Sequence, residues 1–191
     1  SPGGDLAAAL AIGKLVKVKR LDIQIEGSCA SACANYIFIA GNKKTIARNA
    51  VILFHGGMQQ EGLFDAVKST KLGEQSAIHG ATFTEDGKGA PPPYILSAIG
   101  MKKIDSAIEA FPYLIQLEKK YFSEMKVNNE LPTFGQKGKY KEIWGSMKYL
   151  GFYYDLQSLK KLGVKNIEVE GGEWHPEETE LFSQMYEVKY P

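Results

Sequence analysis

The first stretch of the chain shows two kinds of hydrophobic spacing in succession. Between Asp5 and Lys17, apolar residues recur every three or four positions, which predicts a helix with Asp5 as its N-cap. From Leu21 to Glu26, apolar and polar residues alternate one by one, as in a strand with one buried face. A helix followed by a short strand therefore opens the chain.

The same order is repeated further along. Small residues fill positions 27–33, and the apolar run after them predicts a buried helix that ends at Gly41. Segments 44–47 and 50–55 then read as two short strands, the second apolar enough to be covered on both faces. This alternation predicts an α/β fold with a mostly parallel sheet flanked by helices.

The second half is less regular. Glycines and prolines between residues 57 and 103 indicate a loop or lid. Beyond it the pattern predicts an amphipathic helix over 104–126 with a break or new start at Pro112, then a helix over 139–149, a short strand from Phe152, a helix from Leu156 capped by Asp155, and a strand over 164–170. We expect one domain over 1–167 and an acidic tail or interface arm over 168–191.

Composition narrows the function classes. A chain of 191 residues buries roughly two-thirds of its unfolded surface, enough for one hydrophobic core. The net charge of +1 argues against nucleic-acid binding, which usually needs a strongly basic face. No apolar run approaches the roughly 20 residues of a membrane span.

Two residues near the ends of predicted strands have the chemistry of a nucleophile and its base. A serine attacks a carbonyl only when a base takes its proton and amide groups stabilise the oxyanion. Ser31 stands among small residues where a strand turns into a helix, and His55 ends the next long strand. Because the carboxyl ends of neighbouring parallel strands meet at one edge, the two side chains are expected to meet there.

The segments SPGG, GSCASAC and VILFH occur in the order and spacing that resemble the Clp protease proteolytic subunit and its periplasmic relatives, over residues 1–56. The resemblance implies a crotonase-like fold, a nucleophile at Ser31 and a base at His55. It also implies an oxyanion hole from the amides of Gly4 and Ala32. Peptide or protein substrates, a homo-oligomer, a bacterial periplasmic or exported location, and no metal or organic cofactor are further implications.

The third member of a triad is less defined. The segment YDLQSLKKLGVKNIEV is similar to the closing helix and strand of that family, but Gly151 and Phe152 stand about where its acid is expected. Asp155 is the nearest carboxylate, although the pattern favours it as a helix N-cap. Without such an acid, a backbone carbonyl or an asparagine could orient His55. A serine–lysine mechanism resembling signal peptide peptidase A is another alternative, with Lys68, Lys71 and Lys88 as candidates.

Cys29 and Cys33 flank Ser31 at a spacing of four. We favour two small buried side chains over a disulfide, since closing so short a ring requires a particular backbone geometry. In an oxidising compartment a disulfide would stiffen the turn that carries Ser31. The opening Ser1–Gly4 is turn chemistry rather than a natural start, which allows an upstream strand and an export signal before it.

Two functions outside hydrolysis stay open. The first is a catalytically inactive crotonase-like scaffold that binds a peptide or protein partner, favoured by the missing acid. The second is an acyl-CoA enzyme of the same fold.

Overall fold

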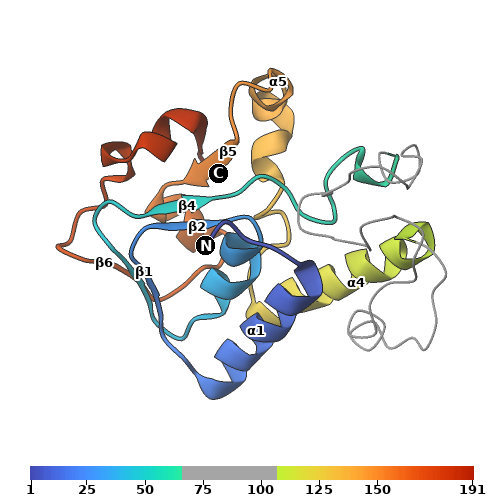
Figure 1. The fold of residues 1–191 in the computed structure, drawn as a ribbon, viewed down its shortest axis with the longest axis horizontal. Helices are drawn as coiled ribbons and strands as arrows, with labels where there is room; N and C mark the ends of the chain where they lie inside the picture. The colour runs from blue at the N-terminus through green and yellow to red at the C-terminus, as the bar shows by residue number, and fades with distance from the viewer. Residues whose placement is uncertain (66–106) are drawn as a thin grey trace.

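The computed structural model describes residues 1–65 and 107–191, and it shows short parallel sheets packed against helices in a mixed α/β arrangement (Figure 1). The first helix, α1, spans Leu6–Lys19. Asp5 caps it as predicted, because its carboxylate accepts a hydrogen bond of 2.8 Å from the Ala8 amide. The capped end places the Ser1–Gly4 segment at the amino end of this helix.

The first half of the chain supplies strands to two parallel sheets. In one sheet, β1 (Ile23–Ile25) pairs with β3 (Lys44–Ile46), and β3 pairs with β6 (Ile167–Val169). In the other, β2 (Ser28–Ala30) pairs with β4 (Val51–Leu53). The strand predicted over 21–26 ends at Ile25. Residues 28–30, which were expected to belong to the small-residue turn, form the strand β2. Successive strands thus alternate between the two sheets.

A third parallel pair extends the sheet of β2 and β4. The strands β5 (Gly151–Tyr154) and β7 (Met185–Val188) pair with each other. An antiparallel bridge joins Phe54 to Phe152, with two backbone hydrogen bonds of 2.8 Å. The carboxyl end of β4 is therefore held against β5, a strand about a hundred residues later in the chain.

Helices account for most of the other regular structure in the described residues. They are the π-helix η1 (Cys33–Phe38), α4 (Ala107–Met125), α5 (Lys141–Gly145), α6 (Leu156–Lys161), and the 3-10 helices η2 (Phe134–Gln136), η3 (Gly138–Tyr140), η4 (Pro176–Glu178) and η5 (Glu180–Gln184). The predicted break at Pro112 is wrong, since α4 continues through it. The predicted stripe at Leu114, Leu117 and Tyr121 is buried. The free energy gained by this burial offsets the cost of the backbone hydrogen bond that a proline cannot donate.

The segment 168–191, expected as an exposed tail or interface arm, is built into the fold. Val188 of β7 is fully buried, and the Trp174 indole donates to the Ala50 carbonyl oxygen at 2.6 Å. The expected boundary at 167 falls inside β6. The segment 168–191 therefore carries acidic residues while its buried apolar residues belong to the core.

The core is rich in aromatic rings, which come from η1, α4, β5 and the residue after β4. Its largest fully buried members are Tyr121, Tyr154, Phe38, Phe54, Phe122 and Phe152. Burying an aromatic side chain removes 150–250 Å² from water, so this cluster dominates the stability of the fold. Among residues 1–65 and 107–191, no helix has both the length and the apolar character needed to span a bilayer.

Candidate functional site

Ser31 occupies a tight turn between β2 and η1. Its φ is 57°, in the left-handed region that residues other than glycine rarely adopt, at a typical cost of about 1 kcal/mol or more. Its amide donates to the Leu53 carbonyl of β4 at 3.0 Å, and its carbonyl accepts from the Asn35 amide at 2.8 Å. The turn is thus held in a strained conformation by the strand beside it and the helix after it.

Cys29 and Cys33 form a disulfide around this turn, which corrects the expectation of two unpaired thiols. Their Cα atoms lie 5.3 Å apart, within the ordinary range for a disulfide. The chain reverses at Ser31, and this reversal supplies the backbone geometry that a ring between residues four apart requires. Ser31 lies at the centre of the closed ring.

Gly3, in the segment Ser1–Gly4 that we call the glycine segment, packs directly against Ser31. A Cβ atom at Gly3 would lie 2.6 Å from the Ser31 Cβ and 2.9 Å from the Ala32 amide nitrogen, so only glycine fits there. The backbone of Ser1–Gly4 runs beside β2, where the Ala30 amide donates to the Ser1 carbonyl oxygen at 2.9 Å. The Cβ direction of Gly4 faces open space. The structure therefore brings the predicted oxyanion segments next to the predicted nucleophile.

His55 lies at the same end of the neighbouring strand. Because Ala30 of β2 is in register with Leu53 of β4, Ser31 and His55 follow the ends of two adjacent parallel strands. Such strands are about 4.8 Å apart. The His55 side chain is half-buried. The predicted nucleophile and base are thus positioned at one sheet edge.

A hollow of about 340 Å³ opens beside His55. Five of its lining residues are apolar, namely Pro2, Ala30, Leu53, Leu150 and Leu181. They come from the glycine segment, from β2 and β4, and from two later segments of the chain. The hollow can accept an apolar group of a ligand next to the imidazole.

Asp155 is the N-cap of α6. Its side chain accepts a hydrogen bond of 2.6 Å from the Ser158 amide, which fixes the start of α6. The structure does not bring this carboxylate to His55, because β5 runs antiparallel to β4.

The strand β5 runs antiparallel to β4 at the bridge between Phe54 and Phe152, so the residue opposite His55 is Gly151. Asp155 lies four residues beyond Gly151, or roughly 13 Å along a strand. A Cβ atom at Gly151 would lie 2.4 Å from the Phe54 carbonyl oxygen, so no side chain fits in that position. The position that faces His55 on β5 therefore holds no acid. Lys68, Lys71 and Lys88 lie outside the described residues, as does most of the expected lid over 57–103.

Glu118 is a buried acid that the sequence reasoning missed. Its side chain has no exposed surface, and its carboxylate contacts the segment directly after His55. Burial raises the pKa of Glu118, while hydrogen bonds from Tyr36, Met58 and Gln59 oppose that rise. The available signal was a glutamate on the apolar stripe of the helix, between Leu114 and Tyr121.

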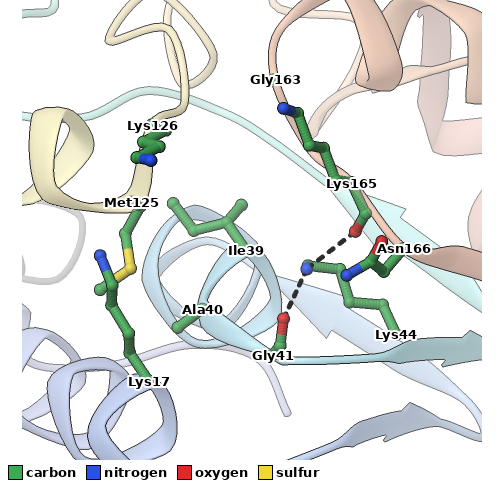
Figure 2. A pocket seen from close by; sticks show the side chains of 10 residues that line it. All are labelled: Lys17, Ile39, Ala40, Gly41, Lys44, Met125, Lys126, Gly163, Lys165 and Asn166. Carbon is green, nitrogen blue, oxygen red and sulfur yellow. Dashed lines mark hydrogen bonds between the residues drawn. The ribbon is translucent and has the colours of Figure 1, made fainter. Parts of the chain in front are cut away.

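A second hollow, of about 220 Å³, lies among helix ends away from Ser31 and contains four lysines (Figure 2). The Lys44 ammonium donates to the carbonyls of Gly41 at 2.6 Å and Lys165 at 2.9 Å, as Figure 2 shows. Burial lowers the pKa of Lys44 to about 8. The Lys17 ammonium bonds the Glu124 carbonyl near the end of α4. Lys17 and Lys44 thus bind backbone carbonyl oxygens, which is a structural role.

Comparisons with protein-family models, with curated proteins and with solved structures give no match to this chain. Within residues 1–65 and 107–191, no group of three or more histidine, cysteine or acidic side chains is arranged to hold a metal ion.

Proposed function

We propose that the chain is a serine hydrolase that cleaves peptide bonds, on a crotonase-like version of the α/β fold that resembles the Clp protease proteolytic subunit. One observation carries the proposal: Ser31 is held at φ 57° beside the glycine segment, at the same sheet edge as His55. Backbone strain of this kind is retained where the surrounding structure enforces it, and it clusters at active sites.

In the proposed reaction, Ser31 Oγ attacks the peptide carbonyl carbon while His55 takes the hydroxyl proton. The amides of Gly4 and Ala32 stabilise the oxyanion of the tetrahedral intermediate. This intermediate collapses, the C–N bond breaks, and His55 returns the proton to the departing amine. Water then attacks the acyl-enzyme with His55 as base and releases the acid and the free Ser31 hydroxyl.

Several features support the oxyanion assignment. The first amides of a helix have no partner inside that helix, and Ala32 stands directly before η1. A Cβ atom at Gly3 would lie 2.9 Å from the Ala32 nitrogen, so the glycine segment runs close beside this amide. The hollow beside His55 offers room for an apolar side chain of the substrate. A disulfide around the nucleophile is compatible with the exported location that the resemblance implies. Assembly into a closed homo-oligomer is part of the same proposal.

The test is labelling with a fluorophosphonate probe, which reacts covalently with an activated serine. Wild type should be labelled and Ser31→Ala should not. Ser28→Ala is the matched control, because Ser28 lies three residues before Ser31, lines the hollow beside His55 and should leave labelling intact. Labelling that persists in Ser31→Ala would reject the assignment of the nucleophile.

A scaffold without catalysis is the second candidate, and the geometry at Gly151 favours it specifically. The residue opposite His55 on β5 cannot carry an orienting carboxylate, and Asp155 is engaged as an N-cap. Wild-type protein that resists the probe at every pH, yet binds extended peptides in a fluorescence-polarisation assay, would support the scaffold over the hydrolase.

A further inference from the structure

The backbone of His55 and Gly56 is held by two buried amide side chains from outside its own strand. Gln136 Nε2 donates to the His55 carbonyl oxygen at 2.9 Å, and Asn35 Nδ2 donates to the Gly56 carbonyl oxygen at 2.8 Å. The backbone amide of Asn35 also donates to the Ser31 carbonyl oxygen at 2.8 Å. Asn35 therefore links the turn of the proposed nucleophile to the segment of the proposed base.

Glu118 of α4 holds the residues that come next. Its Oε1 accepts from the Met58 amide at 3.0 Å, and its Oε2 accepts from Gln59 Nε2 at 3.2 Å. A Cβ atom at Gly57 would lie 2.6 Å from Oε1, so the backbone approaches the carboxylate as closely as a glycine permits. The chain beyond His55 thus lies directly on this acid.

Tyr36 completes the group from the side of η1. Its hydroxyl donates to Glu118 Oε1 at 2.6 Å, and its own carbonyl oxygen accepts from the Tyr121 hydroxyl at 2.5 Å. Tyr36 is the residue after Asn35, so one turn of η1 contacts both Gly56 and Glu118. The segment after β4 is therefore clamped between η1 and α4.

This clamp is costly as a device for stability alone. A buried carboxyl group loses its hydration, and well-packed apolar residues in place of a buried polar pair are often neutral or stabilising. Hydrogen bonds from Tyr36 and Met58 compensate part of that loss. A group that costs stability yet fixes the backbone next to His55 has the properties of a positioning residue.

We infer that Glu118, together with Tyr36, is a positioning residue that holds the His55 segment against η1 and so keeps the imidazole beside Ser31. The inference rests on the proposed function, since it concerns the geometry of the same nucleophile and base. Glu118 acts through the backbone of Gly57 and Met58 rather than on the substrate.

The decisive variant is Tyr36→Phe/Glu118→Met, which replaces the bonded pair of side chains by apolar groups of similar shape and leaves the Met58 amide without its acceptor. We expect its urea midpoint to stay close to that of wild type, because removal of a buried carboxyl group offsets the loss of the Met58 hydrogen bond. We expect its fluorophosphonate labelling rate at Ser31 to fall by about tenfold to 100-fold, as for a small misplacement of reacting groups. Glu118→Gln keeps one acceptor oxygen for Tyr36 and Met58, so its labelling rate should lie between those of wild type and the double variant. Glu124→Gln is the matched control, because this glutamate is exposed on the same helix.

A second readout is independent of labelling. The ring signals of His55 in proton–nitrogen NMR spectra, assigned by comparison with His55→Gln, should shift or broaden in the double variant and remain unchanged in Glu124→Gln. Unchanged His55 signals, or a double variant that labels like wild type, would overturn the inference. A parallel loss of stability and labelling would also overturn it, because that result describes a structural residue only. A wild type without labelling whose His55 signals still respond would reject the proposed function and leave the clamp in place.

Discussion

Two strand-to-helix turns of this protein have opposite characters. At the end of β2, Ser31 adopts φ 57° inside a disulfide ring, and a π-helix follows. At the end of β5, Asp155 adopts an extended conformation (φ −65°, ψ 163°) and caps an ordinary α-helix through a hydrogen bond to Ser158. The first turn is strained and braced from several sides, whereas the second is relaxed and satisfied by one local contact.

The difference lies in how each turn is held. A left-handed conformation alone does not set Ser31 apart, because the non-glycine residues Arg20, Lys126, Met147 and Asn166 also have positive φ. The turn at Ser31 is instead covalently closed, packed by Gly3 and hydrogen-bonded to the end of β4. We therefore expect changes at the first turn to affect reactivity and changes at the second to affect only stability.

The largest effect is expected for Gly3→Ala, which breaks the strained turn. The new methyl group would lie 2.6 Å from the Ser31 Cβ, at a φ of 99° that alanine rarely adopts. Displacement of the glycine segment removes an oxyanion donor, so the labelling rate of Ser31 should fall by about 100-fold or more. Gly27→Ala is the control, since nothing lies within 4 Å of its Cβ direction. Wild-type labelling of Gly3→Ala would show that this segment takes no part in the reaction.

Reduction of the disulfide should weaken the same turn to a smaller extent. Opening a ring between residues four apart returns chain entropy to the unfolded state, which amounts to about 2 kcal/mol in the entropy model. The urea midpoint of wild type should drop with a phosphine reductant, and labelling should slow because Ser31 gains freedom. The Cys29→Ala/Cys33→Ala variant should show no response to the reductant. The prediction fails if both thiols titrate in reduced protein while the midpoint is unchanged.

The smallest effect is expected for Asp155→Ala, which changes the relaxed turn at the end of β5. Loss of the cap should reduce the free energy of unfolding by about 1 kcal/mol, measured by urea denaturation. Labelling of Ser31 should remain at the wild-type rate, since Asp155 lies four residues along the chain from Gly151, the residue opposite His55. Asp155→Asn, which preserves a capping oxygen, should retain most of the stability. A strong loss of labelling in both variants would return Asp155 to the catalytic group.

Local patterns in the sequence anticipated much of this structure. The helix capped by Asp5, the strand at Ile23–Ile25 and the helix capped by Asp155 were predicted from periodicity and capping residues. The placement of Ser31 and His55 at one edge followed from the parallel order of the strands. These features depend on residues close in the chain, which is why they can be read from it.

Other features depend on contacts between distant segments. The disulfide was not favoured, because the spacing of Cys29 and Cys33 does not reveal the left-handed turn that brings them together. The segment 168–191 looked like a tail because its acidic residues hide the few apolar positions that pair β7 with β5. Glu118 was not singled out from the sequence, because its contact with the segment at Gly57 joins two parts of the chain about sixty residues apart.

An α/β alternation and a serine in a small-residue turn can be read from the chain alone, because side-chain spacing and turn chemistry act over a few residues. The antiparallel meeting of β5 and β4 emerges only in the folded molecule, where it puts Gly151 opposite His55 and Asp155 four residues further along the chain. Only the tertiary structure also buried Glu118 against the His55 segment. The physical reason is that strand register and helix packing are set by contacts between residues far apart in the chain, which no local pattern encodes.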